Sequence, residues 1–151
     1  MPKKSAGILA YRHNIELQFF LVHPGGPYFT KKDLAVWTIP KGEFGDDEEP
    51  LLAAIREFKE ETGFNPTGTY KQLTPIKQAS GKVVHAWSVE FDLDADAISS
   101  NLFKIEWPPN SGLLTEFPEV DKGGWFNSED AKRKIIPAQV AFLNELGLLL
   151  A

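Results

Sequence analysis

The chain contains no cysteine among its 151 residues. Disulfides, thiolate metal sites, iron–sulfur clusters and cysteine nucleophiles are therefore excluded, and any metal ligand or nucleophile must be oxygen or nitrogen. An excess of basic residues is also absent, because 16 Lys and Arg stand against 21 Asp and Glu, for a formal net charge of −5. This balance is the opposite of the basic footprint of a nucleic-acid-binding domain, so duplex nucleic acid is not an expected partner.

Long hydrophobic runs are missing as well. The apolar run at residues 148–151 is far shorter than the ~20 residues that cross a bilayer. The N-terminus has Lys3 and Lys4 but no apolar segment after them, so it does not resemble a secretory signal. We therefore expect a soluble cytoplasmic protein with no membrane partner.

The chain does have enough apolar material for a core. Hydrophobic residues make up 42% of it and aromatic residues 12%, which excludes disorder as the main state. A length of 151 residues fits one domain. We predict a single domain over residues 1–151.

Extended segments are predicted near both ends of the chain. Residues 8–11 and 15–22 are typical of a hairpin with its turn at 12–14, and a Pro- and Gly-rich loop follows from His23. Residues 83–91 alternate with period two, which predicts a strand that pairs with 69–76. After an irregular excursion over 92–117, the chain is expected to rejoin the sheet at 124–126. Ser128 is predicted to cap a short helix, and a last helix is predicted after Pro137.

The clearest helix follows Gly45. Asp46 and Asp47 are its candidate N-caps, and Gly63 is placed to end it. At about 100° per residue, an apolar stripe is predicted to pack on the sheet while an acidic arc lies on the other side. The stripe consists of Leu51, Leu52, Ile55 and Phe58, and the arc consists of Glu57, Glu60 and Glu61.

The acidic arc predicts a divalent cation site. Carboxylates on adjacent turns repel one another unless something positive lies among them, and Mg²⁺ prefers oxygen ligands. Arg56 is free to pair with Glu48 and so to hold the preceding loop against the helix. The alternatives are a solvated acidic surface for the arc and an ordinary surface ion pair for Arg56 and Glu48.

These residues form part of a longer pattern, G-x5-E-x7-R-E-U-x-E-E-x-G-U, where U is a bulky apolar residue. Its positions are filled by Gly42, Glu48, Arg56, Glu57, Phe58, Glu60, Glu61, Gly63 and Phe64. The pattern is the Nudix box, and on it the chain resembles the Nudix hydrolases. The resemblance implies an α/β (α+β) fold, an α/β/α sandwich around a mixed central sheet. It also implies metal-dependent hydrolysis of a pyrophosphate link in a nucleoside diphosphate joined to another moiety.

The resemblance further implies site residues. The ligands of Mg²⁺, with Mn²⁺ as a substitute, are expected to be Glu57, Glu60, Glu61 and a backbone carbonyl near Gly42, while Arg56 and Glu48 form the supporting pair. Nudix enzymes often place another glutamate, as ligand or general base, far down the chain. Glu119 is the candidate for that role, Glu116 is its rival, and Glu57 is the competing base.

Residues outside the box are candidate substrate contacts. The ammonium group of Lys41 is placed to bind a phosphate, although exposed lysines often have no specific role. Trp107 is a candidate for stacking on a base, although an aromatic residue near prolines more often pins a loop to the core. His85 alternates with buried residues and is interpreted as a sheet or core histidine.

The lead-in to the box narrows the substrate class. Residues 37–42 are similar to those of dinucleoside polyphosphate hydrolases, and the whole chain resembles bacterial proteins predicted to be nucleoside triphosphate pyrophosphohydrolases. We therefore expect a small-molecule nucleotide substrate, either a nucleoside or a dinucleoside polyphosphate, and a monomer or homodimer. The tyrosine that dinucleoside polyphosphate hydrolases often carry past the box would fall at 80–82, where the chain has Ser, Gly and Lys.

Several alternatives stay open. ADP-ribose and nucleotide sugars are alternative substrates, although the proline typical of ADP-ribose pyrophosphatases is missing. Diphosphoinositol polyphosphates would call for a broad basic rim, yet the lysines and arginines are scattered apart from 31–32 and 132–134. An isoprenoid diphosphate isomerase of the same fold is excluded because it would need a cysteine. A non-catalytic nucleotide sensor is the alternative from another class, although such modules commonly lose box carboxylates that are all present here.

Overall fold

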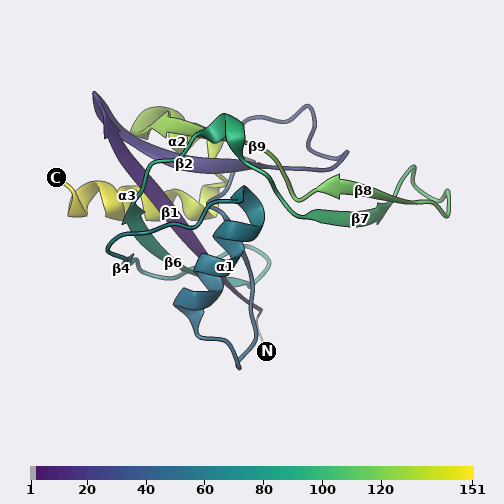
Figure 1. The fold of residues 1–151 in the computed structure, drawn as a ribbon, viewed down its shortest axis with the longest axis horizontal. Helices are drawn as coiled ribbons and strands as arrows, with labels where there is room; N and C mark the ends of the chain where they lie inside the picture. The colour runs from purple at the N-terminus through teal and green to yellow at the C-terminus, as the bar shows by residue number, and fades with distance from the viewer. Residues whose placement is uncertain (1–2) are drawn as a thin grey trace.

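A computed structural model describes residues 3–151, and a seven-stranded mixed sheet lies at its centre (Figure 1). Strand β1 (Lys4–Asn14) runs through the sheet with β6 (Val83–Glu90) parallel on one side and β2 (Glu16–Pro24) antiparallel on the other. Beyond β2 lies β9 (Val120–Asn127), also antiparallel. Three short strands complete the sheet: β3 (Lys41–Glu43) beside β1, and β4 (Lys71–Gln72) and β5 (Ile76–Lys77) beside β6.

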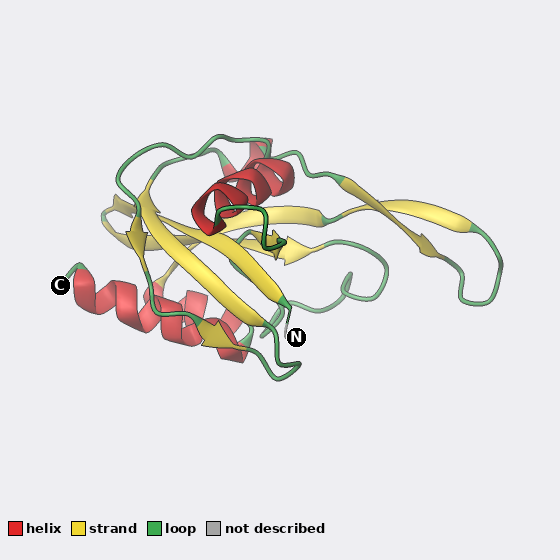
Figure 2. Cartoon of the chain, turned by 90° about the horizontal axis from the view of Figure 1, so that it is seen from below, coloured by secondary structure: helices red, strands yellow, loops and turns green. Residues whose placement is uncertain are grey.

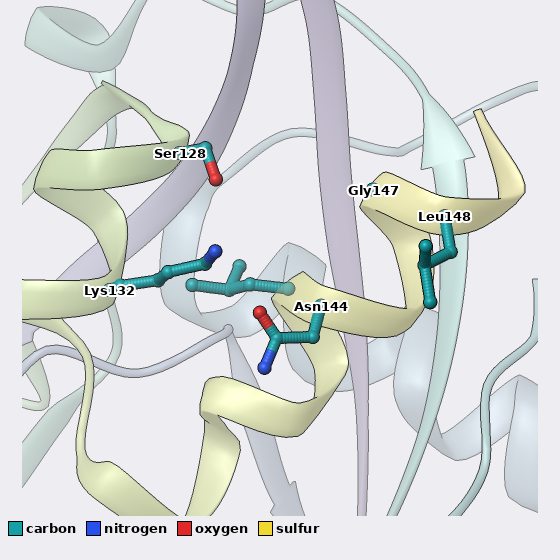
Figure 3. Close-up of a pocket in the computed structure, with 6 residues that line it drawn as sticks. Ser128, Lys132, Asn144, Gly147 and Leu148 are labelled. Atoms are coloured by element: carbon teal, nitrogen blue, oxygen red, sulfur yellow. The ribbon is translucent and has the colours of Figure 1, made fainter. Parts of the chain in front are cut away.

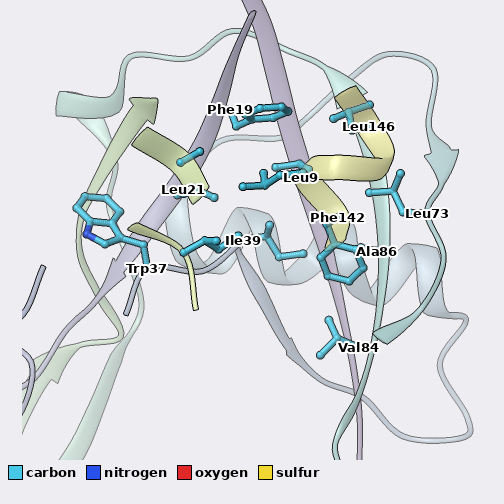
Figure 4. Packing of buried hydrophobic residues seen from close by; sticks show 13 residues of the cluster. Leu9, Phe19, Leu21, Trp37, Ile39, Leu73, Val84, Ala86, Phe142 and Leu146 are labelled. Carbon is cyan, nitrogen blue, oxygen red and sulfur yellow. The ribbon is translucent and has the colours of Figure 1, made fainter. Parts of the chain in front are cut away.

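Helices cover both faces of the sheet (Figure 2). Alternation along β1 sends Ala6, Ile8 and Ala10 into the core beneath α1 (Pro50–Thr62), while Leu9 points to the other face. That other face packs against α2 (Ser128–Lys134) and α3 (Val140–Leu149), with the short 3₁₀ turn Pro137–Gln139 between them. Figure 4 shows this second core, where Phe19, Leu21, Trp37, Ile39, Phe142 and Leu146 lie together. The predicted α/β/α sandwich with a mixed sheet is confirmed.

The first hairpin differs from the sequence prediction in its turn. Strand β1 continues through Asn14, and the chain reverses at Ile15, whose φ of 68° lies in the left-handed region. The predicted turn at 12–14 is therefore wrong, because Arg12 and His13 pair with Gln18 and Leu17 in the ladder.

Local interactions set both ends of helix α1. Its N-cap is Glu49, whose side chain accepts a hydrogen bond from the Leu52 amide, so the predicted caps Asp46 and Asp47 are wrong. Gly63 ends the helix as predicted, at φ 82°. Leu52 is 63% exposed rather than buried, because the small residues Ala53 and Ala54 face the sheet instead.

One hairpin projects from the sandwich. Strands β7 (Leu102–Glu106) and β8 (Leu114–Pro118) pair only with each other and extend away from the sheet (Figure 1). We call this hairpin, residues 102–118, the arm. It follows the 3₁₀ turn Ala95–Ala97, and it leads directly into β9.

The N-cap of helix α2 differs by one residue from the prediction. Asn127, not Ser128, caps α2, because its side chain accepts a hydrogen bond from the Asp130 amide. Among the helices of residues 3–151, none is both long enough and apolar enough to cross a bilayer.

Candidate active site

Two glutamates of α1, Glu57 and Glu61, are buried at the sheet edge by β3. They are only 7% and 9% exposed, whereas Glu60 is partly exposed, so the alternative of a solvated acidic surface is wrong for Glu57 and Glu61. The Lys41 backbone N–H lies 3.3 Å from Glu61 Oε1 and donates to it. A Cβ added at Gly42 would lie 2.0 Å from the Glu57 carboxyl carbon, so only glycine leaves room for that carboxylate. Pairing of β3 with β1 thus brings the start of the box against the end of its helix.

Arg56 joins the loop before the helix to the helix itself. Its Nε and one terminal nitrogen donate to the two carboxylate oxygens of Glu48 at 2.8 and 2.9 Å, a bidentate pair as predicted. The other terminal nitrogen lies 2.9 Å from Glu57 Oε1 and 3.2 Å from Glu60. These hydrogen bonds, Glu48 foremost, raise the pKa of Arg56, and Arg56 in turn lowers the pKa of Glu48.

The carboxylates destabilise one another's charge in the absence of a cation. Burial, followed by the charge of Glu57, raises the pKa of Glu61 to about 8. Burial and then the charge of Glu60 raise the pKa of Glu57. Within residues 3–151 no group of three or more His, Cys, Asp or Glu side chains is already arranged as a cation cage. The donor set nevertheless fits a hard divalent ion, because Glu57, Glu60 and Glu61 carry three negative charges when ionised, whereas Lys41 and Arg56 supply two positive charges and Arg56 is already paired with Glu48.

Glu119 lies across from the helix. It occupies the link between β8 and β9, and its negative charge contributes to the raised pKa values of both Glu57 and Glu61. Its own pKa is raised by burial and then by Glu60. The rival Glu116 instead lies on the exposed arm, 3.8 Å from Lys104. The structure therefore brings Glu119, and not Glu116, toward the carboxylates of α1.

Lysines that are far apart in the sequence gather around β3. Lys82 lies 3.1 Å and Lys3 3.9 Å from the Glu43 carboxylate, and Lys4 pairs with Asp46. Burial, followed by the positive charge of Lys82, lowers the pKa of Lys41, which places these two ammonium groups near each other. Lys82, Lys3 and Lys41 all help to lower the pKa of Glu43, and we call these three residues the lysine cluster. The interpretation of the lysines as scattered is wrong, because strand pairing of β1, β3 and β6 aligns residues that the sequence separates by up to 79 positions (82 − 3).

Trp107 and His85 each contact another aromatic ring. Trp107 sits on the arm, where its ring meets Tyr28 edge-on at 5.5 Å between ring centroids. This contact ties the arm to the loop after β2, and neither ring is among the core residues. The stacking role of Trp107 stays a prediction. His85 is half-buried on β6 with Phe44 at 6.1 Å between centroids, which agrees with a sheet histidine.

Several known proteins resemble this chain in sequence or in fold. Residues 1–146 match the NUDIX domain. The chain belongs to the Nudix family. It is 52% identical over 98 residues to the mRNA-decapping protein g5R of African swine fever virus, a match that covers 62% of this chain and 38% of the viral protein. It is 30% identical over 123 residues to the RNA pyrophosphohydrolase of Agrobacterium fabrum, covering 68% of this chain and 64% of that protein.

A solved structure covers almost the whole Nudix chain. The C. elegans Ap4A hydrolase in a binary complex aligns with 98% of this chain and 97% of its own, at a TM-score of 0.64 and 25% identity. By contrast, the matched stretches span about two fifths of the viral decapping protein and just under two thirds of the bacterial enzyme. Family membership and the pyrophosphohydrolase relative support a hydrolase that acts on phosphorus-containing anhydrides.

A cavity on the other face of this Nudix domain lacks the carboxylates of the box. Figure 3 shows a cavity of about 350 Å³ between α2 and α3, on the face of the sheet opposite α1. No carboxylate lines it; its lining residues are Ser128, Lys132, Leu143, Asn144, Gly147 and Leu148. The candidate active site therefore stays at the carboxylates of α1.

Sequence reasoning missed some residues that the structure places at the site. The sequence gives no local signal for Lys82, because a lone lysine resembles any surface lysine, and it assigns Gly25 only to a Pro- and Gly-rich loop. Two adjacent glycines between prolines were a signal of close backbone approach, since glycine is required where another chain segment leaves no room for Cβ.

The raised Glu61 pKa predicts a stability effect in the metal-free protein. Because Glu61 has a pKa of about 8 when folded and an ordinary value of 4.5 when unfolded, its ionisation destabilises the fold, increasingly as the pH rises through that interval. Glu61→Gln removes this cost. With a chelator present, we expect the variant to melt a few degrees above wild type at about pH 9 and no higher at about pH 4. Thermal melts of both proteins at the two pH values test this, and an equal gain at both would contradict it.

Proposed function

We propose that this protein hydrolyses a pyrophosphate link in nucleoside or dinucleoside polyphosphates, using Mg²⁺ or, as a substitute, Mn²⁺. The observation that carries the proposal is the pair of buried box carboxylates at β3, with Glu57 against Gly42 and Glu61 accepting the Lys41 N–H. The proposed ligands are Glu57, Glu60, Glu61 and the backbone carbonyl at Gly42. When bound, the metal would lower the pKa of the attacking water and neutralise charge on the phosphates.

The protein's own residues have distinct tasks in the proposed reaction. Arg56, held by Glu48, fixes the orientation of Glu57 and Glu60 through its third and fourth hydrogen bonds. Glu119 is proposed to accept the proton of the attacking water, with Glu57 as the competing base. The water oxygen then bonds to phosphorus, and the phosphorus–oxygen bond of the anhydride breaks to release the second phosphate product.

The surroundings of β3 support a polyphosphate substrate that carries a base. The lysine cluster offers positive charge for phosphates beyond the scissile link, with Lys41 and Lys82 its inner members. On the α2–α3 side of the sheet, a cavity of about 390 Å³ is lined by Gln78, Ala79, Ser80, Ile136, Pro137 and Ala138. The backbone of Lys82 is hydrogen-bonded to Gln78 and Ser80 at its rim. An apolar wall with a few amide and hydroxyl groups suits a nucleobase. The similarity to an Ap4A hydrolase points the same way, since Ap4A is a dinucleoside polyphosphate.

Diphosphoinositol polyphosphates are the second candidate substrate class. The lysine cluster favours them, because it supplies the basic rim that the sequence alone did not reveal. The neighbouring apolar cavity favours nucleotides, since an inositol ring bearing phosphates has no apolar face for Ile136 and Pro137 to cover.

A hydrolysis screen tests the proposal. Purified protein with Mg²⁺ is given nucleoside triphosphates, diadenosine polyphosphates, nucleotide sugars, ADP-ribose and diphosphoinositols, and the products are identified by mass. The highest kcat/KM is expected for a nucleoside or dinucleoside polyphosphate. A tenfold preference for ADP-ribose, a nucleotide sugar or a diphosphoinositol would overturn the substrate assignment. Binding without turnover of any compound would favour the non-catalytic sensor.

Lys82 is expected to select for longer phosphate chains. We predict that Lys82→Gln raises KM about tenfold for diadenosine tetraphosphate, because one charge-assisted contact is lost, and less than about twofold for ADP-ribose. Lys104→Gln is the matched control, since Lys104 lies on the arm beside Glu116. Equal changes for both substrates would contradict the assignment of Lys82 to an outer phosphate.

A further inference from the structure

The link that carries Glu119 is packed directly against Gly25. The Gly25 backbone N–H donates to the Glu119 carbonyl oxygen at 2.9 Å. A Cβ added at Gly25 would lie 1.9 Å from the Pro118 carbonyl oxygen and 3.4 Å from the Glu119 carbonyl carbon. Gly25 is buried, and its φ lies outside the left-handed region that favours glycine. Its requirement for glycine is therefore one of space and not of backbone conformation.

The neighbouring glycine extends this close contact to the arm. A Cβ added at Gly26 would lie 2.9 Å from the tip of the Phe103 ring on β7. The two glycines thus let the loop after β2 approach both the base of the arm and the link between β8 and β9.

The opposite side of the link is tied to the C-terminal end of α1. The Glu119 N–H donates to the Asn101 carbonyl oxygen at 2.8 Å, and the Asn101 N–H donates to the Glu60 carbonyl oxygen at 2.9 Å. The Ser99 N–H likewise donates to the Thr62 carbonyl oxygen at 2.9 Å. Residues 99–101 therefore connect the backbone of Glu119 to the last turn of the helix that bears the box glutamates.

Ser100 strengthens the same connection with its side chain. Its Oγ accepts a hydrogen bond from the Val120 N–H at 3.0 Å. The backbone of Glu119 is consequently held from two sides, by Gly25 from the loop and by residues 99–101 from the end of α1.

We propose that Gly25 is a positioning residue for the proposed reaction, which sets the distance of the Glu119 carboxylate from the glutamates of α1. The proposal rests on the function proposed above and adds a residue outside the Nudix box to it. An alanine at 25 has to displace the 118–119 peptide from its position against the loop, because the atom it meets is backbone that cannot rotate away. The Glu119 carboxylate is then displaced relative to Glu57 and Glu61.

A double-mutant cycle between Gly25→Ala and Glu119→Gln tests the proposal. We expect Gly25→Ala to lower kcat roughly 10- to 100-fold with KM changed less than about threefold, since a shift of about 1 Å at a catalytic group has effects of that size. The double variant is expected to match Glu119→Gln alone within about threefold. Once the Glu119 carboxylate has been neutralised, its displacement by Gly25→Ala has no further effect on kcat. Gly147→Ala is the matched control, since a Cβ there meets no atom within 4 Å.

Ser100→Ala provides a second variant that adds no atoms to the packed site. It removes the acceptor of the Val120 N–H, and we expect a kcat loss of roughly three- to tenfold that also disappears in the Glu119→Gln background. Multiplicative effects in both cycles would overturn the positioning role while leaving the hydrolase function in place.

Hydrogen exchange supplies a readout that needs no substrate. The Glu119 and Val120 amides are expected to exchange at least about tenfold faster in Gly25→Ala than in wild type, whereas amides of β6 keep their protection. Unchanged protection at Glu119 and Val120 would overturn the proposal. If wild type hydrolysed no compound in the screen, the proposed function would fail, and the exchange rates would still decide whether Gly25 holds the link.

Discussion

Glu61→Gln is expected to lower kcat by several orders of magnitude while the fold persists. Glutamine keeps the volume and an oxygen that can still accept the Lys41 N–H, but it removes one of the charges proposed to hold the metal. Loss of a metal ligand costs several kcal/mol of transition-state stabilisation, and each 1.36 kcal/mol is a factor of about ten in rate. The measurement is kcat at saturating Mg²⁺, with circular dichroism to confirm folding.

The matched control for that variant is Glu116→Gln. Glu116 is an exposed carboxylate on the arm, so its replacement makes the same chemical change away from α1. We expect a rate within about twofold of wild type, as for most surface substitutions. A Glu61→Gln protein that retained a near-normal rate at saturating Mg²⁺ would overturn its assignment as a ligand.

Gly42→Ala is expected to give the second large effect. The new Cβ would lie 2.0 Å from the carboxyl carbon and 2.1 and 2.3 Å from the two oxygens of Glu57, so that carboxylate has to leave its position. We expect kcat to fall at least about 100-fold, and the free energy of unfolding to fall by about 1–3 kcal/mol from overpacking.

The specificity of this effect can be checked against other variants. Gly147→Ala controls for the change of residue type, because its Cβ points into open space. The activity loss of Gly42→Ala should also largely vanish in a Glu57→Gln background, since the same carboxylate is displaced by one change and neutralised by the other. A Gly42→Ala enzyme with normal turnover would show that the position of Glu57 is not critical.

Much of the fold could be predicted from local signals. Two β-rich runs located β1 and β2, a period-two segment located β6, and Gly63 marked the end of α1. The spacing of the box identified the glutamates that the structure places around β3. These features depend on neighbouring residues, which a sequence displays directly.

Features that depend on contacts between distant segments could not be predicted. The helical wheel separates an apolar stripe from an acidic arc, but it cannot indicate that β3 lies over the arc and buries Glu57 and Glu61. Ala53 and Ala54 are buried and Leu52 is exposed, because packing on distant strands decides which face of the helix meets the sheet. Strand pairing positions Lys82, and backbone packing positions Gly25, each through segments that are distant in the sequence.

The most direct test of the central claim is the metal dependence of hydrolysis in wild type and in Glu61→Gln. Diadenosine tetraphosphate or a nucleoside triphosphate, whichever the screen favours, is incubated with each protein in chelator and across a Mg²⁺ titration, and products are followed by ³¹P NMR. We predict no turnover in chelator, turnover that rises and saturates with Mg²⁺ in wild type, and almost none at any Mg²⁺ concentration in Glu61→Gln. Equal rates with and without metal, or equal rates for the two proteins at saturating Mg²⁺, would contradict the account.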